Sequence, residues 1–262
     1  MSAQENNLSF WEHLDALRVV IIKSLCAWII GAICVFAMKK TVFHLLFAPS
    51  KSDFILFRAI CRVAQHFNAN FTTPDLSDIQ FLNTELTAQF TTHIQVSLWG
   101  GLIIAIPLII YWLYGFISPA LYEKEKHYST IALSVSILLF TLGVLLNYFL
   151  IFPLSFRFLS GYEVYSEVHN QISLSSYIST FLILSLLMGL LFEIPILTWF
   201  LNKIGILKAE TLKYYRRHTF VAILIVAAVI TPTGDPFTLL LVTLPVYLLY
   251  ELSILIIRKN QS

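Results

Sequence analysis

The segment that most constrains this chain is an apolar run from Leu174 to Phe200 that carries one acid, Glu193, inside it. The run exceeds the roughly 20 residues that an α-helix needs to cross the hydrocarbon core of a bilayer. A charged side chain near the bilayer centre costs roughly 2.5 to 3.5 kcal/mol, so such an acid usually faces protein, water or a functional path. We therefore expect a membrane helix in which Glu193 has a partner or a function. A protonated acid that leans toward the interface is the alternative.

The composition places the whole chain, and not only this segment, in a membrane. Of its 262 residues 58% are hydrophobic and 12% are charged, whereas soluble domains carry roughly 25% charged residues. The net charge of +2 and the absence of a Lys/Arg-rich block predict no nucleic-acid partner. The amino-terminal 18 residues contain no apolar run, so they do not resemble a cleavable signal peptide.

Six apolar segments are predicted to cross the membrane, which gives an all-α polytopic protein. The fifth is short, because its apolar run, Thr219 to Ile230, would extend about 18 Å against a hydrocarbon core of about 30 Å. The sixth contains Pro245 and Glu251 and is a second candidate for a short span. The predicted spans are residues 19–36, 94–116, 129–152, 174–200, 217–230 and 237–257, with a long polar first loop at 39–93 that holds small helices.

The basic residues predict the orientation of the chain. Lys and Arg concentrate in the cytoplasmic loops of membrane proteins, most reliably in short connections. A cytoplasmic amino terminus puts most of the 17 lysines and arginines on the cytoplasmic side, with a cluster at 202–217, whereas the connection at 153–173 on the opposite side holds only Arg157. Both termini are therefore predicted to be cytoplasmic.

The acids do not form a catalytic pair in this topology. Paired catalytic carboxylates must lie close together, whereas Glu193 lies inside a predicted span and Asp235 in the turn between the last two spans. No histidine is spaced with a Cys or Ser in a recognisable catalytic motif, no glycine-rich phosphate loop occurs, and the three cysteines have no metal-binding spacing. We therefore predict a protein of binding and passage, with no enzymatic activity, cofactor or metal.

Two interpretations of the predicted cytoplasmic face stay open. Glu12, Asp15 and Glu125 could be solvated charges balanced by basic neighbours such as Arg18 and Lys126. Alternatively, the acids could form a recess for a basic peptide, because carboxylates bind guanidinium groups through short, often bidentate hydrogen bonds.

Five short segments, which follow one another along nearly the whole chain, carry a resemblance to a known family. They are FWEHLDALR at Phe10–Arg18, SPALYEKEK at Ser118–Lys126, FPLSFRFL at Phe152–Leu159, GLLFEIP at Gly189–Pro195, and TPTGDPF with LPVYLLYE between Thr231 and Glu251.

Together these segments resemble the TatC family, the integral membrane subunit of the Sec-independent twin-arginine protein translocase. The resemblance implies a six-span cupped bundle in the bacterial cytoplasmic (inner) membrane. It implies a receptor for signal peptides with consecutive arginines on folded cargo. It further implies single-span TatA/TatB-type partner subunits, self-association, and transport driven by the proton-motive force.

The resemblance also implies which residues recognise the signal peptide. The family's arginine contact, an acid in the loop between the second and third spans, matches Glu125. A second family glutamate falls on Ala16 here. Either Asp15, one position earlier and about 100° away around a helix, or Glu12 replaces it, or recognition depends more heavily on Glu125.

Other family positions carry supporting roles. Arg18 matches the motif arginine and, with Lys126, is expected to orient the acidic loop. Glu193 matches an intramembrane glutamate that lines the concave face of the bundle. Asp235 matches the acid of the turn, and Glu251 is expected either to meet polar groups of a partner helix or to lie at the interface.

Two other functions compete with this prediction. Glu193 within the membrane would also suit a small-solute or proton-coupled transporter. A scaffold for other membrane subunits would retain partner helices without recognising cargo. The extra residues of the first loop, from Lys51 to about Leu82, predict no function.

Overall fold

The computed structural model describes residues 10–66, 81–83, 85–117, 126–165, 170–231 and 234–259, without the side chains of residues 10, 117, 126–130, 230 and 259. Within these ranges the regular secondary structure is helical except for two strands of two residues each. Five helical stretches are long and apolar enough to cross a membrane: Trp11–Ala37, Ala88–Phe116, Ile131–Gly161, Leu174–Lys203 and Pro236–Arg258. The chain is therefore an all-α polytopic membrane protein.

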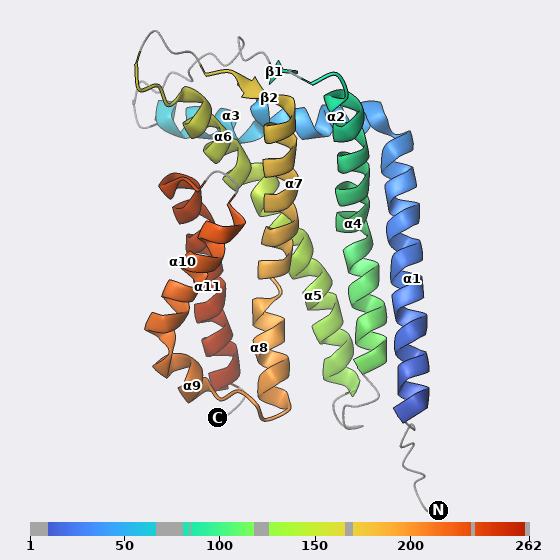
Figure 1. The fold of residues 1–262 in the computed structure, drawn as a ribbon. Coiled ribbons are helices and arrows are strands. Elements are labelled where there is room, and N and C mark those ends of the chain that lie inside the picture. Colours follow the sequence, from blue (N-terminus) through green and yellow to red (C-terminus); the bar gives the residue numbers. More distant parts are fainter. Residues whose placement is uncertain are drawn as a thin grey trace, which may run out of the picture.

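Helices α1 (Phe10–Ala37) and α4 (Ala88–Ile117) lie side by side at one edge of the bundle (Figure 1). Small residues let their backbones approach closely. A Cβ atom on Gly101 would lie 2.3 Å from the backbone nitrogen of Ala32, so a side chain at this position would force the helices apart. Helix α1 starts well before the predicted span, so the FWEHLDALR motif forms its opening turns.

The third apolar segment is one continuous helical stretch with a defect in its middle. It consists of α5 (Lys126–Leu146), a π-helical turn η4 (Asn147–Ile151) and α6 (Phe152–Gly161). The predicted span ended at Phe152, but the helix continues through Pro153. A proline ring clashes with the carbonyl four residues earlier in a regular helix, and the wider π turn that precedes Pro153 changes that spacing.

The fourth apolar segment is broken at the acid that it carries. Helix α7 (Leu174–Leu191) and helix α8 (Ile194–Lys203) are separated by Phe192 and Glu193, which form a turn. Pro195 explains the break, because it has no N–H to bond the carbonyl of Leu191. The break places Glu193 at the start of α8 rather than inside a regular helix.

Helices α9 (Ala209–Tyr214), α10 (Arg216–Ile230) and α11 (Pro236–Lys259) complete the bundle. With 15 residues, α10 extends about 22 Å, which agrees with a short fifth hydrophobic segment. The turn before α11 places α10 and α11 side by side (Figure 1).

A cap covers the end of the bundle opposite the start of α1 and the end of α11 (Figure 1). Tyr148 donates its hydroxyl to the carbonyl of Leu45 at 3.1 Å, and Tyr177 donates to that of Leu46 at 2.8 Å. These bonds tie the first loop to the helices beneath it. The cap consists of α2 (Lys39–Phe47), η1 (Ala48–Ser50), α3 (Ile55–His66) and the parallel strands β1 (Phe81–Leu82) and β2 (Ile172–Ser173).

The predicted small helices of the first loop are confirmed, but the strands were not predicted. Phe81 pairs with Ile172, and pairing over such a separation in sequence leaves no local pattern. The aromatic rings of Phe47, Phe81 and Tyr177 pack against one another beside this pair, with centroid separations of 4.9 to 5.2 Å.

Candidate functional site

A pocket of about 650 Å³ opens between α1, α4 and α5, toward the end of the bundle where α1 begins. The ring of His13 stacks on that of Phe116 with centroids 4.3 Å apart, which fixes the opening turns of α1 against the end of α4. Apolar and aromatic side chains dominate the wall, and one lysine joins them. The lining residues are Ala16, Val19, Val20, Lys23, Tyr111, Trp112, Tyr114, Gly115, Phe116 and Leu133.

The acids of α1 differ in their relation to this pocket. Glu12, Asp15 and Arg18 are all exposed, and none of them lines it. Glu12 lies one, two or three helical turns before each of the α1 lining residues, Ala16, Val19, Val20 and Lys23, and so shares their face, whereas Asp15 is in such a register only with Val19 and Lys23. Helix geometry therefore favours Glu12 over Asp15 as the acid at the rim of the pocket.

The structure does not test the role of the loop acid that is expected to contact arginine. Glu125 lies outside the described residues, and Lys126 begins α5 with a side chain that is also outside them. Their predicted roles therefore stay predictions. The helix that follows Glu125 does contribute Leu133 to the pocket wall.

Glu193 is buried between α5 and the break in the fourth segment, with 9% of its surface exposed. The hydroxyl of Ser136 donates to its Oε2 at 2.5 Å. Its Oε1 is also buried and has no hydrogen-bond partner among the described residues. The partner that the acid requires is thus a serine 57 positions away, which no local motif indicates.

A second polar contact joins the same helices. Asn147, fully buried in the π turn, donates its amide to the hydroxyl of Ser185 at 2.8 Å, and Ser185 donates to the carbonyl of Phe181. Buried polar groups within a membrane are costly unless paired. The two contacts therefore fix how α5 packs against α7 and α8.

The remaining acids have structural partners within the chain. Asp235 accepts a hydrogen bond from the backbone N–H of Thr238 at 2.7 Å and so caps α11. Glu251 forms an ion pair with Arg216 and accepts the hydroxyl of Tyr247 at 3.0 Å. This polar cluster lies near the end of the bundle where α11 ends.

These features define a class of protein. The long apolar helices, the polar contacts between them and the pocket at the end where α1 begins describe a polytopic membrane protein with a candidate binding site. No group of His, Cys, Asp and Glu within the described ranges could hold a metal ion.

Comparison with known proteins identifies the family. The family model described as "Sec-independent protein translocase protein (TatC)" matches residues 12–245. A protein of that name from Blattabacterium sp. subsp. Periplaneta americana is 36% identical, over 98% of this chain and 97% of its own length. One from Aquifex aeolicus is 34% identical, over 93% and 92%.

Solved structures point to the same family as the sequence relatives do. The "Crystal Structure of Twin Arginine Translocase Receptor- TatC" is 33% identical, superposes with a TM-score of 0.76, and is covered completely by 96% of this chain. A second crystal structure of that receptor, in the detergent DDM, gives a TM-score of 0.77. The chain belongs to the TatC family of Sec-independent, twin-arginine protein translocase proteins, which are not enzymes.

Proposed function

We propose that this chain is the signal-peptide receptor of a twin-arginine translocase, and that the pocket between α1, α4 and α5 is where recognition occurs. The observation that carries the proposal is the position of this pocket beside the acid-bearing face of α1. The paired arginines of a signal peptide would bind the carboxylates of Glu125 and Glu12, because charge-assisted bonds to guanidinium are strong and directional. Arg18 and Lys126 would orient the acids, and Asp15 would contribute charge at the rim.

The pocket wall suits the part of a signal peptide that follows the arginines. That part is apolar, and the side chains of Tyr111, Trp112 and Phe116 provide an apolar surface directly inside the rim. Burial of apolar surface would then add to the charge contacts. A peptide with arginines alone would bind less tightly than a complete signal peptide.

The proposed orientation puts both termini in the cytoplasm of a bacterial cell, with the chain in the inner membrane. Helix α1 begins and α11 ends at the same end of the bundle (Figure 1). Basic residues gather there in the short connection between α8 and α10, which contains Lys203, Lys208 and Lys213. The positive-inside rule supports this orientation.

The proposed partners are single-span TatA/TatB-type subunits and further copies of this chain, which together would use the proton-motive force to export folded proteins. Helix α10 presents exposed apolar side chains, with Val221, Ile225 and Val229 at 52%, 59% and 82% exposure. Glu193, whose Oε1 is buried without a hydrogen-bond partner among the described residues, is proposed to line the concave face of the bundle. The transporter alternative has no counterpart in the family to which the chain belongs.

Photo-crosslinking of the reconstituted protein to a twin-arginine signal peptide tests the proposal. We expect Glu125→Gln to reduce crosslinking most, Glu12→Gln to reduce it less, and Asp15→Asn to have the smallest effect. Asp53→Asn in the cap serves as the matched control. Crosslinking that stays at the control level in Glu125→Gln, and in a double variant with Glu12→Gln, would contradict the assigned site.

A further inference from the structure

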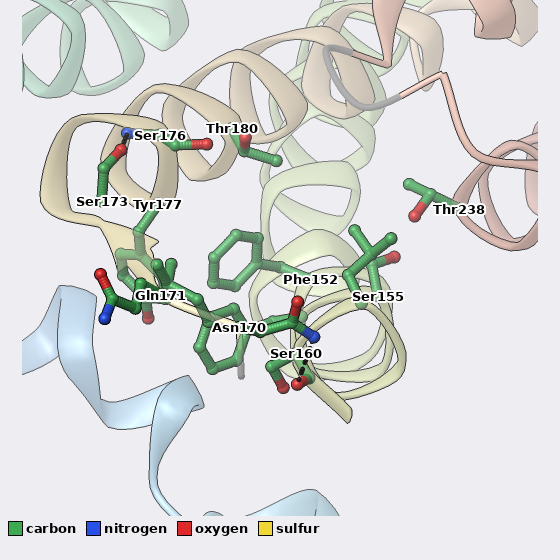
Figure 2. Close-up of a pocket in the computed structure, with 13 residues that line it drawn as sticks. Phe152, Ser155, Ser160, Asn170, Gln171, Ser173, Ser176, Tyr177, Thr180 and Thr238 are labelled. Carbon is green, nitrogen blue, oxygen red and sulfur yellow. Dashed lines mark hydrogen bonds between the residues drawn. The ribbon is translucent and has the colours of Figure 1, made fainter. Parts of the chain in front are cut away.

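A second pocket, of about 370 Å³, lies at the cap end of the bundle, between α6, α7, β2 and the start of α11 (Figure 2). Aromatic and aliphatic side chains form part of its wall, and hydroxyl and amide groups form the rest. None of its lining residues carries a formal charge. The residues that line it are Phe152, Ser155, Phe156, Leu159, Ser160, Asn170, Gln171, Ile172, Ser173, Ser176, Tyr177, Thr180 and Thr238.

Two hydroxyls in this wall lack hydrogen-bond partners although they are buried. Ser155 is 2% exposed and Thr238 is 1% exposed, and their Oγ atoms contact no donor or acceptor among the described residues. Figure 2 shows both side chains on the same side of the Phe152 ring, at the edge of the pocket. Buried polar groups in folded proteins normally have a partner, so these hydroxyls, each of which can donate and accept, point to a polar ligand.

The opposite wall of the pocket adds further donors. Ser176 and Thr180 lie one turn apart on α7 and line the pocket with their hydroxyls. Ser176 lies in the first turn of α7, where backbone N–H groups have no intrahelical acceptor and the helix dipole is positive. The hydroxyl of Ser173 satisfies one of them, the N–H of Ser176, at 3.1 Å. The pocket therefore favours a ligand with several acceptor oxygens.

The depth of the pocket identifies the source of such a ligand. Its hydroxyls lie on α6 and on the first two turns of α7 and α11, at the cap end of these apolar helices. The phosphate and ester oxygens of phospholipids lie at this level, between water and hydrocarbon. The apolar side chains of Phe152, Phe156 and Leu159 would contact the upper part of an acyl chain.

We propose that this pocket binds one phospholipid of the leaflet on the cap side, through hydrogen bonds from Ser155, Thr238, Ser176 and Thr180 to its phosphate and ester oxygens. The lipid would join α6, α7 and α11 at the cap. The site is separate from signal-peptide recognition and does not depend on it.

A comparison of two threonines on α11 tests the proposal. Thr243 is 4% exposed and its hydroxyl, like that of Thr238, has no hydrogen-bond partner in the described part of the chain, but it does not line the pocket. Wild type, Thr238→Val, Ser155→Ala and Thr243→Val would be purified in dodecyl maltoside and titrated with phosphatidylglycerol or phosphatidylethanolamine. The readouts are the melting temperature and the lipid retained in native mass spectrometry.

We expect Thr238→Val and Ser155→Ala to need roughly three- to tenfold more lipid for the half-maximal rise in melting temperature, since each loses one hydrogen bond to the lipid. Thr243→Val should respond as the wild type does. Equal lipid dependence in all four proteins would overturn the proposal. If inorganic phosphate or glycerophosphate raised the melting temperature as much as the lipid does, the ligand would be a free anion and the lipid proposal would be wrong. Unchanged signal-peptide crosslinking in Thr238→Val separates this result from the recognition test.

Discussion

The interface between α5 and α7–α8 differs from the pair formed by α10 and α11 in how polar groups are used. In the former, a Ser136–Glu193 contact and an Asn147–Ser185 contact are buried between closely packed backbones. In the latter, the ion pair of Arg216 with Glu251 is partly exposed, at 42% and 25% of side-chain surface. The difference suggests a rigid wall on one side of the bundle and an adaptable one on the other, where partner helices are proposed to bind.

The strongest test of the rigid wall is the substitution Gly143→Ala. Its new Cβ atom would lie 2.4 Å from the carbonyl oxygen of Met188, a backbone atom that cannot move without the whole helix. We expect a loss of about 3 kcal/mol in the free energy of unfolding, measured by denaturant titration in detergent. Gly161→Ala is the matched control, because its Cβ would meet nothing within 4 Å. Equal stability of the two variants would refute the close packing.

A smaller effect is expected when the partner of Glu193 is removed. Ser136→Ala leaves both oxygens of a buried carboxyl without a hydrogen bond, so we expect a loss of about 1 kcal/mol in the same titration. Thr141→Ala on the same helix provides the comparison, since the Thr141 hydroxyl bonds only the carbonyl of Ile137 and is exposed. A Ser136→Ala protein as stable as Thr141→Ala would show that the contact does not hold the wall together.

Glu251→Gln, on the α10–α11 side, should lower the free energy of unfolding less than Ser136→Ala does. The pair with Arg216 is partly exposed, and such pairs contribute about 0 to 1 kcal/mol. Salt screens exposed charges, so the difference from wild type should shrink between low and high ionic strength. A salt-independent loss as large as that of Ser136→Ala would remove the contrast between the two interfaces.

The smallest effect is expected at an exposed pair in the cap, outside both interfaces. The guanidinium of Arg58 donates hydrogen bonds to Asp53 and holds the pKa of that carboxyl below its usual value. A depressed folded-state pKa stabilises the fold above the unfolded-state pKa, and this contribution is lost as the pH falls through the folded-state value. Asp53→Asn should therefore lower the melting temperature only slightly, and by the same amount at pH 6 and at pH 8, because Asp53 is ionised throughout this range. A pH-dependent shift in that range would point to a second titrating group in the cap.

Local sequence patterns anticipated the helices but not all of their ends. Hydrophobic length identified the membrane segments, and the proline and glycine of the last turn correctly placed α10 beside α11. The helix that carries the predicted span ending at Phe152 continues past Pro153, because a π turn precedes the proline. Glu193 and Pro195 were visible in the sequence, yet the helix break between α7 and α8 was not predicted.

The candidate sites also have a part that the sequence predicted and a part that only the structure showed. The motifs alone pointed to Glu125, Glu12 and Asp15, and the structure adds the pocket that ranks Glu12 ahead of Asp15 by helix rotation. The cap-end pocket had no sequence signal, because its hydroxyls come from three helices and act together only when those helices are packed.

By itself the sequence determined that this chain is a helical membrane protein of the translocase family, because hydrophobic length and short ordered motifs are local properties. Only the tertiary structure decided which groups meet. It joined Glu193 to Ser136, β1 to β2 and Ser155 to the same pocket as Thr238. The physical reason is that a buried polar group needs a partner, and packing chooses that partner from residues that lie far away in the chain.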